Sequence, residues 1–355
     1  MYRLLIARAP LAIAQPPRLA LRAGRLMLCV VAVGLASSLP AQAATFATFD
    51  PPGSIRTLAL SINNGAITGS YTDGNNVSHA FLRAADGKIT TFDVSGSTET
   101  VAYNINASGA IAGYYLDGNS VSHGYVRGSD GTITTFDPPG SVYTFAYAIN
   151  KKGVITGAYL DSDYFEHGYV RSVDGKIKSF DPPYTHETVA FGINSKGAIT
   201  GAGGSYKDDN NHGYVRSPAG KITLFDPAGS VNTTAYGITD DGTIAGDYVD
   251  ASDVGHGFVR DAGGKITTFD PTGSAVTEPF AINNKGQIAG DFKDAGGVYH
   301  GFLRKPKGTI TVFDVPGASW TFPRSIDGAS NDRGTIAGSY TDANGVYHGF
   351  LRTSK

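Results

Sequence analysis

The sequence has one cysteine, Cys29, which lies in an N-terminal segment unlike the rest of the chain. Once that segment is removed, a disulfide framework, thiol catalysis and a cysteine-ligated metal are all excluded. No apolar stripe recurs at helical spacing, which favours an all-β protein. No linker or low-complexity block divides residues 44–355, so we expect them to form a single domain.

Common catalytic motifs are also missing. The chain contains no Gly-x-Ser-x-Gly, no His-Glu-x-x-His and no phosphate-cradling glycine loop. Basic residues are few: without the five arginines of the N-terminal segment, 24 of the 29 remain, against 31 acidic residues. Nucleic acid binds basic surfaces, so this balance predicts no nucleic-acid partner.

Residues 1–43 are typical of a secretory signal peptide. Five arginines precede an apolar run at 26–39, and Ala41-Gln42-Ala43 follows it. This order predicts cleavage after Ala43, although the long basic region leaves room for a start codon further downstream. The apolar run is shorter than the roughly 20 residues that span a membrane. We therefore expect a secreted protein, extracellular or periplasmic, with no membrane insertion after cleavage.

Seven near-copies of one unit fill the rest of the chain. Each copy carries a His, then an aromatic residue and an Arg, and a Phe-Asp pair that recurs every 43 to 45 residues. A period of about 44 residues is typical of propellers and solenoids. The histidines are His79, His123, His167, His212, His256, His300 and His348. The paired aspartates are Asp50, Asp93, Asp137, Asp181, Asp226, Asp270 and Asp314.

Each unit divides into four short strands. In the second copy we expect strands at 100–106, 110–117, 123–127 and 132–137, separated by glycine-containing turns. Four strands in each of seven units predict a seven-bladed β-propeller of four-stranded antiparallel blades. A β-solenoid is the structural alternative, but its turns are usually shorter.

The two ends of the repeat region match complementary strands. TFATFD at 45–50 matches a fourth strand, and HGFLR at 348–352 matches a third strand. We therefore expect the N-terminal strand to complete the last blade and close the ring, because closure hides sheet edges.

The His and the Asp lie 14 residues apart in the six units where the Asp follows the His. A two-residue turn at 130–131 would place Gly124 opposite Asp137 and bring His123 next to Asp137. We interpret this pair as a hydrogen bond that every blade needs, rather than as part of a metal array.

The motifs also resemble those of a known family. His-Ala-Phe and His-Gly-Phe, in a unit with Asn-x-x-Gly, Gly-x-Ile-x-Gly and Phe-Asp, resemble the bacterial extracellular HAF-repeat family. The resemblance covers essentially all of residues 45–355. It implies a secreted repeat protein and supplies no activity, substrate or catalytic residue.

Loops such as those beginning at Asp117, Asp161 and Asp208 are rich in Asp and Asn. The glycine and glutamate of a calcium-binding EF-hand loop are not kept across the copies. Asp and Asn also form tight turns by bonding their own backbone. We therefore predict turn chemistry and no cofactor, with Ca²⁺ at single loops as the alternative.

One predicted face of the ring is the best place for a site. It carries the loops from fourth to first strands and from second to third strands, and we call it the channel-mouth face. Each first strand begins with a constant Thr preceded by a varied residue. This varied ring is our candidate ligand site, unless these are simply tolerant loop positions. The candidate ligand-binding residues are Arg56, Glu99, Tyr143, Glu187, Asn232 and Trp320.

Two units depart from the pattern. The fourth has Tyr184-Thr185-His186-Glu187 where Gly-Ser is usual, and the last inserts four residues around 324–331. The last unit also carries Trp320, the only Trp. An exposed Trp beside Tyr143 would suit stacking on a sugar, and a core Trp explains it nearly as well.

Three hypotheses follow for function. The first is a monomeric secreted binding module for a glycan or an extracellular protein. The second is a hydrolase or lyase that uses acidic residues near the central channel. Its weak catalytic candidates are Glu99, Glu187 and His186, with Asn232. The third is a passive structural surface protein. The sequence alone favours the first because no spacing fixes a catalytic pair.

Overall fold

The computed structural model describes residues 44–328 and 334–354. The predicted signal peptide, and part of the insertion around 324–331, therefore lie outside the described residues. Those described form 28 β-strands and no helix, which confirms the all-β prediction. No candidate membrane-spanning helix is found in these two segments.

The strands follow one order, and we refer to first, second, third and fourth strands of a repeat. The first strands are β2 (Ser54–Asn63), β6 (Glu99–Ile105), β10 (Tyr143–Ile149), β14 (Thr185–Ile193), β18 (Ser230–Ile238), β22 (Ser274–Ile282) and β26 (Trp320–Ile326). The second strands are β3 (Ala66–Asp73), β7 (Ile111–Leu116), β11 (Ile155–Leu160), β15 (Ile199–Ser205), β19 (Ile244–Asp250), β23 (Ile288–Asp294) and β27 (Ile336–Thr341).

The remaining strands complete each group. The third strands are β4 (Ser78–Arg83), β8 (Ser122–Arg127), β12 (Glu166–Arg171), β16 (Asn211–Arg216), β20 (Gly255–Arg260), β24 (Tyr299–Arg304) and β28 (Tyr347–Thr353). The fourth strands are β1 (Thr45–Phe49), β5 (Ile89–Phe92), β9 (Ile133–Phe136), β13 (Ile177–Phe180), β17 (Ile222–Phe225), β21 (Ile266–Phe269) and β25 (Ile310–Phe313).

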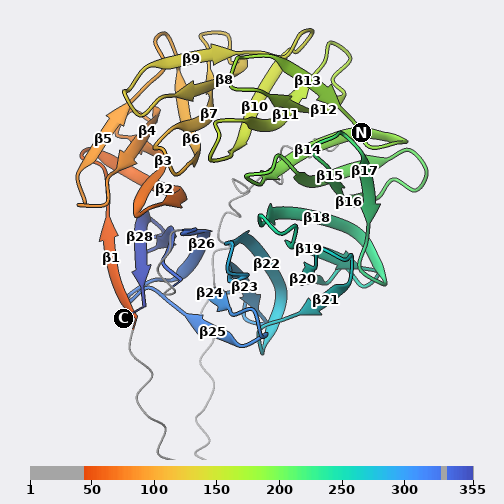
Figure 1. Ribbon diagram of the computed structural model, residues 1–355. Helices are drawn as coiled ribbons and strands as arrows, with labels where there is room; N and C mark the ends of the chain where they lie inside the picture. The colour runs from red at the N-terminus through yellow and green to blue at the C-terminus, as the bar shows by residue number, and fades with distance from the viewer. Residues whose placement is uncertain (1–43, 329–333, 355) are drawn as a thin grey trace, which may run out of the picture. The chain divides into compact units, whose positions relative to one another are not determined.

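Within each group, consecutive strands pair antiparallel, as in β6, β7, β8 and β9. The predicted N-terminal pairing is present: β1 runs antiparallel to β28, from Thr45 opposite Thr353 to Phe49 opposite Gly349. The groups lie around a common axis, with first strands innermost and fourth strands at the periphery (Figure 1).

The groups are not independent sheets, which differs from the prediction of separate four-stranded blades. Single parallel bridges join Ser78 to Glu99, Glu166 to Glu187 and Gly255 to Val276. The described strands therefore fall into three eight-stranded sheets and one four-stranded sheet. None of these sheets closes on itself.

The predicted register of the outer hairpin is wrong by one residue. Gly124 lies opposite Phe136 rather than Asp137. Gly128 N–H donates to the Thr132 carbonyl and Gly131 has φ of +91°, so the loop has three residues instead of two. A glycine in the left-handed region at the end of a three-residue hairpin loop is a common alternative to the two-residue turn.

The core lies between neighbouring groups. In one cluster, Ala112 of β7 packs with Ile149, Ile155 and Tyr169 from the next repeat. Such shared clusters recur around the chain, so each repeat buries its apolar face only against its neighbours.

Candidate ligand-binding face

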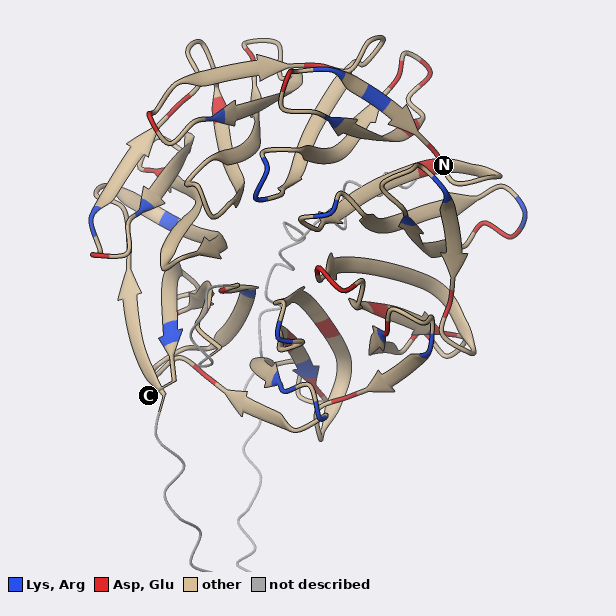
Figure 2. Cartoon of the chain, in the orientation of Figure 1, with Lys and Arg blue, Asp and Glu red and all other residues tan. Residues whose placement is uncertain are grey.

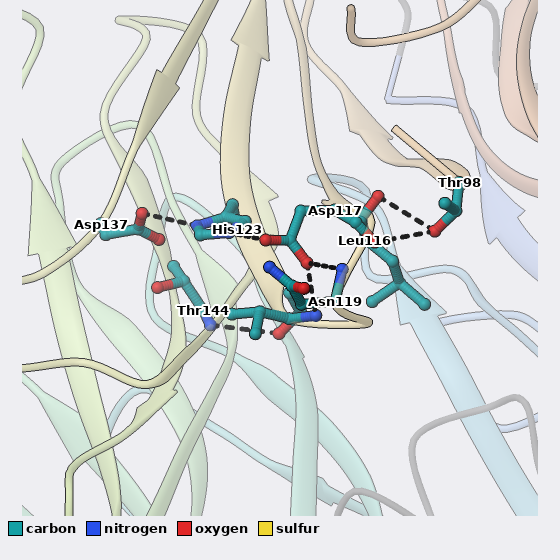
Figure 3. Close-up of polar contacts among 9 residues, drawn as sticks. Thr98, Leu116, Asp117, Asn119, His123, Asp137 and Thr144 are labelled. Carbon is teal, nitrogen blue, oxygen red and sulfur yellow. Dashed lines mark hydrogen bonds and ion pairs between the residues drawn. The ribbon is translucent and has the colours of Figure 1, made fainter. Parts of the chain in front are cut away.

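Each repeat histidine lies between two aspartates, as Figure 3 shows for His123. His123 Nδ1 lies 2.8 Å from Asp137 Oδ2, and its Nε2 lies 3.7 Å from Asp117 Oδ2. Asp117 also accepts hydrogen bonds from the backbone N–H groups of Asn119 and Val121. The predicted His–Asp bond is confirmed in all seven repeats. Loop aspartates such as Asp117 thus make the predicted turn bonds.

The constant threonine extends this network into the following repeat. Thr57 Oγ1 donates to Asp50 at 2.5 Å, and Thr277 Oγ1 donates to Asp270 at 2.6 Å. Burial opposes protonation of His256, but its hydrogen bonds to Asp270 and Asp250 outweigh that effect and raise its pKa. In these two repeats the network therefore ties the outer hairpin to the next first strand, which is a structural role.

The repeat arginines also join neighbouring repeats. The Arg127 guanidinium lies 4.8 Å from the ring centre of Phe92, which belongs to the preceding fourth strand. Arg83 lies 5.1 Å from Phe49 of β1 in the same way. Cation–π contacts of this kind account for the Arg and for the Phe of the Phe-Asp pair.

The varied positions each face one residue of the preceding third strand, the residue just before its His. We call these seven juxtapositions the mouth pairs. Three are the parallel bridges given above, and three rest on side-chain contacts. At the remaining junction, Ser122 Oγ accepts the backbone N–H of Thr144, the residue after Tyr143. The mouth pairs are Ser78/Glu99, Ser122/Tyr143, Glu166/Glu187, Asn211/Asn232, Gly255/Val276, Tyr299/Trp320 and Tyr347/Arg56. The scaffold is thus constant while the chemistry differs at every junction.

Among the mouth pairs, Glu166/Glu187 is the one that brings two carboxyl groups together. Glu166 is 5% exposed, and its Oε1 has no hydrogen-bond partner among the described residues. Burial, together with the charge of Glu187, raises the pKa of Glu166 to about 8. Burial also raises the pKa of Glu187, and the neighbouring His186 opposes that rise. Both carboxyls of the pair are therefore harder to ionise than free glutamates, Glu166 the more so.

Arg56 lies between two partners at the junction of first and last repeats. Its guanidinium is 5.3 Å from the ring centre of Tyr347, and burial lowers its pKa against the attraction of Tyr347 and Glu99. Burial raises the pKa of Glu99, and Arg56 opposes the rise. Two predicted ligand residues are therefore electrostatically coupled.

Trp320 lies in an aromatic cluster rather than beside Tyr143. Its ring centre is 5.8 Å from Tyr299 and 6.1 Å from Phe322, and it is half-buried. Tyr143 instead contacts Tyr164 at 6.4 Å. The expected juxtaposition is wrong because β26 and β10 lie on different sides of the ring (Figure 1).

The weak catalytic candidates do not form one group. Glu99 is coupled to Arg56, whereas Glu187 and His186 lie with Glu166 two repeats away. Asn232 accepts a hydrogen bond from the Asn211 backbone at 3.0 Å. The sequence reasoning missed Glu166 because that residue varies within the loop before the His, where it was read only as turn chemistry.

A row of aromatic rings on the inner strands was also missed. Tyr103, Tyr147, Phe191, Tyr236 and Phe280 contact one another in that order, at centre distances of 5.0 to 5.7 Å. The Arg324 guanidinium continues the row at 4.0 Å from Phe280. Each of these residues lies three positions after the constant Thr, and aligning the repeats at that Thr would have revealed the row.

Arg324 also contacts a buried carboxyl, that of Asp291, which has a second acidic residue beside it. Its Nη1 lies 3.1 Å from Asp291 Oδ2, and Asp291 has no exposed surface. Glu278 is the cross-strand partner of Asp291. Burial raises the pKa of Asp291, Arg324 opposes the rise, and the Glu278 charge reinforces it. The same second-strand position holds another aspartate, Asp247, in the preceding repeat, whereas the third and fourth repeats have Ala158 and Ala202 there.

Among the described residues, charges of both signs are scattered around the common axis (Figure 2).

Comparison with known proteins shows the fold. No family model matches the chain, and no curated protein matches it in sequence. The β-propeller domain of the Trilobed protease from Pyrococcus furiosus, described as having an open velcro topology, superposes with a TM-score of 0.59 at 11% identity. That match covers 84% of this chain and 95% of the other.

Puromycin hydrolase gives a TM-score of 0.58 at 10% identity, covering 84% of this chain. The match spans about half of that enzyme, 53% of its length. A fungal lectin from Aleuria aurantia, described as a six-bladed propeller, gives only 0.42 at 12% identity, with 75% of this chain and 97% of the lectin covered. The chain is therefore an all-β protein of propeller-like fold, and identities this low carry no activity across.

Proposed function

We propose that this chain is a secreted, monomeric seven-bladed β-propeller that binds a glycan through its channel-mouth face. The observation that carries the proposal is the set of mouth pairs. Each pair lies between a constant His, bonded to its Asp in all seven repeats, and a constant buried Thr. The pair itself changes from carboxyls to amides to aromatics. A fixed scaffold with varied side chains is what a ligand site needs.

The blade count and the closure belong to this proposal. Four-strand groups occur at each of the seven repeats, and β1 supplies the fourth strand of the last one. Contacts between the first and last repeats support a closed ring. Ser339 and Ser325 accept backbone N–H groups of β2, and Asp327 accepts two more from the turn after it.

Secretion and membership of the HAF-repeat family also remain proposals, supported by the N-terminal pattern and the repeat motifs. The glycan is favoured over an extracellular protein because the mouth pairs mix aromatic rings with carboxyl and amide groups. Rings stack on the flat faces of sugars, and the polar groups bond their hydroxyls.

A thermal-shift screen of the purified protein tests the proposal, using neutral and acidic oligosaccharides, divalent metals and a chelator. A ligand at a hundred times its Kd adds about 2.7 kcal/mol of stability. We expect a shift with one class of sugar, lost in Trp320→Ala without loss of folding. A shift by Ca²⁺, reversed by the chelator, would instead establish a metal site. No shift with any sugar would reject the glycan.

A hydrolase is the second candidate, and one observation favours it. Glu166, with a pKa raised to about 8, is the bridge partner of the more exposed carboxyl of Glu187, and two neighbouring carboxyls in different environments can serve as acid and base. Glu187→Gln should then abolish turnover of a bound oligosaccharide while leaving its binding intact. Unchanged oligosaccharides after long incubation with the unaltered protein would reject this candidate.

A further inference from the structure

Two tyrosines occupy backbone positions that other repeats give to small or polar residues. Tyr184 has φ of +67° and Tyr164 has φ of +64°. Glycines with φ between +80° and +86° stand at the Tyr184 position in the other repeats: Gly53, Gly96, Gly140, Gly229, Gly273 and Gly317. Residues with φ between +57° and +87° stand at the Tyr164 position: Asn76, Ser120, Asp209, Asp253, Gly297 and Gly345.

The left-handed conformation is unfavourable for a bulky side chain, and burial does not offset the cost here. The side chains of Tyr164 and Tyr184 are 65% and 67% exposed, and Tyr206 is 63% exposed. They are the three most exposed aromatic side chains among the described residues. Tyr164 and Tyr184 keep a strained backbone conformation although their side chains stay exposed, which points to a functional requirement.

These tyrosines gather on one part of the channel-mouth face. Glu166 and Glu187 are bridge partners, so the loops that precede them, 161–165 and 182–186, run side by side. Tyr206 N–H donates to the Tyr184 carbonyl at 3.0 Å, which joins the loop after β15 to them.

Other side chains hold the rings in this group. Tyr143, a mouth residue, lies 6.4 Å from Tyr164, and the Lys207 ammonium lies 3.8 Å from the Tyr184 ring centre. We call Tyr143, Tyr164, Tyr184 and Tyr206 the tyrosine cluster.

We propose that the tyrosine cluster is an outer subsite that binds a neutral glycan chain, extending the site at the mouth pairs. This inference rests on the proposed glycan function and adds the residues and the charge class of the ligand. The loops that carry the rings also carry exposed carboxylates, Asp163, Asp208 and Asp209, and Lys207 is their only Lys or Arg. Carboxylates accept bonds from sugar hydroxyls, and their charge repels anionic polymers.

Amphipathic tyrosines in exposed loops give large contact area at low entropic cost. The exposed apolar surface of the cluster consists of aromatic rings. Phe165 is the only other large apolar residue exposed in these loops. A protein interface centre would instead be fully desolvated and depleted of charge. The chemistry of the cluster therefore fits a neutral polysaccharide better than a protein.

The experiment restores the residue type of the other repeats. Tyr184→Gly and Tyr164→Asn are compared with the unaltered protein by melting temperature and by affinity electrophoresis in galactomannan, xyloglucan, mixed-linkage glucan and polygalacturonate. Relief of strain should raise Tm by about 2 °C in each variant. Retardation by a neutral polysaccharide should weaken at least tenfold in Kd, with none by polygalacturonate. Val173→Asn, at a residue equally exposed at 65%, should change neither binding nor mobility.

The possible outcomes separate this inference from the proposed function. Binding lost in Trp320→Ala but kept in both tyrosine variants would overturn the proposed subsite at the tyrosine cluster and leave the mouth pairs as the binding site. Binding lost in the tyrosine variants but kept in Trp320→Ala would support the cluster alone. Retardation by polygalacturonate, absence of any glycan binding, or loss of a captured protein in the tyrosine variants would each overturn the neutral glycan as the occupant.

Discussion

His348 Nδ1 lies 2.7 Å from Asp50 Oδ2, although 298 residues separate the two in the chain. Inside the other repeats the same contact spans 14 residues, as between His123 and Asp137. The end of the repeat region therefore bonds to its beginning with the geometry used within each repeat. If the ring is closed, this contact should matter as much as its internal copies.

Asp50→Ala should lower the free energy of unfolding by about 1–3 kcal/mol, because both His348 and Thr57 lose a partner. Asp270→Ala is the matched control, since Asp270 also bonds one His and one Thr and its side chain is almost equally exposed. Urea unfolding of both variants gives the comparison. A clearly smaller cost for Asp50→Ala than for Asp270→Ala would contradict closure through β1.

The bonds between the repeat histidines and their aspartates predict how stability depends on pH. The pKa values of His167, His212, His256 and His300 are raised because hydrogen bonds and charges of their aspartates outweigh burial. A raised folded pKa gives stability that is complete below the unfolded value of 6.5 and is lost as pH rises through the folded value. Urea midpoints should therefore fall between pH 6 and pH 8. Midpoints that rise over this range would contradict the assignment.

Glu166 should contribute to the same fall in stability with rising pH. Its folded pKa of about 8 lies above the unfolded value of 4.5, so stability is lost as pH rises between them. Glu166→Gln removes the charge, and it should stabilise the protein at pH 7 by up to about 3 kcal/mol and flatten the profile. Glu187→Gln, at a more exposed carboxyl, should do less. A lower stability of Glu166→Gln at pH 7 would show that the buried carboxylate is held by a partner.

The propeller-like fold could be predicted because the same strand and turn residues recur in every repeat. The His, Asp and Gly positions recur for reasons of backbone geometry, so period and turn residues indicate strand order directly. The outer-hairpin register was missed since Asp130-Gly131 fits either a two-residue or a three-residue loop, and only the φ of Gly131 decides between them. The number of blades and the closure remain predictions.

The candidate site was predicted only in part. The varied position before each Thr was visible in the sequence. Its partner, the residue before the His of the preceding third strand, was not, because pairing across repeats depends on how neighbouring strands approach. Tyr184 stood out in the sequence as a replacement for Gly. Its meaning came only from φ and exposure, which a sequence does not give. Asp291 was missed for a similar reason, since its burial depends on Glu278 and Arg324 from other strands.

The Gly-x-Ile-x-Gly motif should be intolerant of side chains at its second glycine. A Cβ on Gly157 would lie 1.9 Å from the Phe145 carbonyl oxygen of the neighbouring strand. Gly157→Ala must separate the two inner strands, and we expect a loss of at least about 3 kcal/mol or failure to fold. Gly140→Ala is the control, because its Cβ meets open space and only its φ of +83° is unfavourable, costing about 1 kcal/mol. Equal costs for the two variants would reject the close approach.

Arg324 should be needed mainly at high pH. It is the cation bonded to the fully buried Asp291, whose pKa is raised by burial and by Glu278. Removing the cation in Arg324→Met raises that pKa further, so the protein must either keep Asp291 protonated or bury an unpaired charge. Because a raised carboxyl pKa removes stability as pH increases, the variant should lose about 3 kcal/mol at pH 8 and clearly less at pH 5. The double variant Arg324→Met with Asp291→Asn should recover most of the loss at pH 8, as a double-mutant cycle by urea unfolding would measure. A loss independent of pH, or unchanged by Asp291→Asn, would mean that Arg324 stabilises the ring through its contact with Phe280 alone.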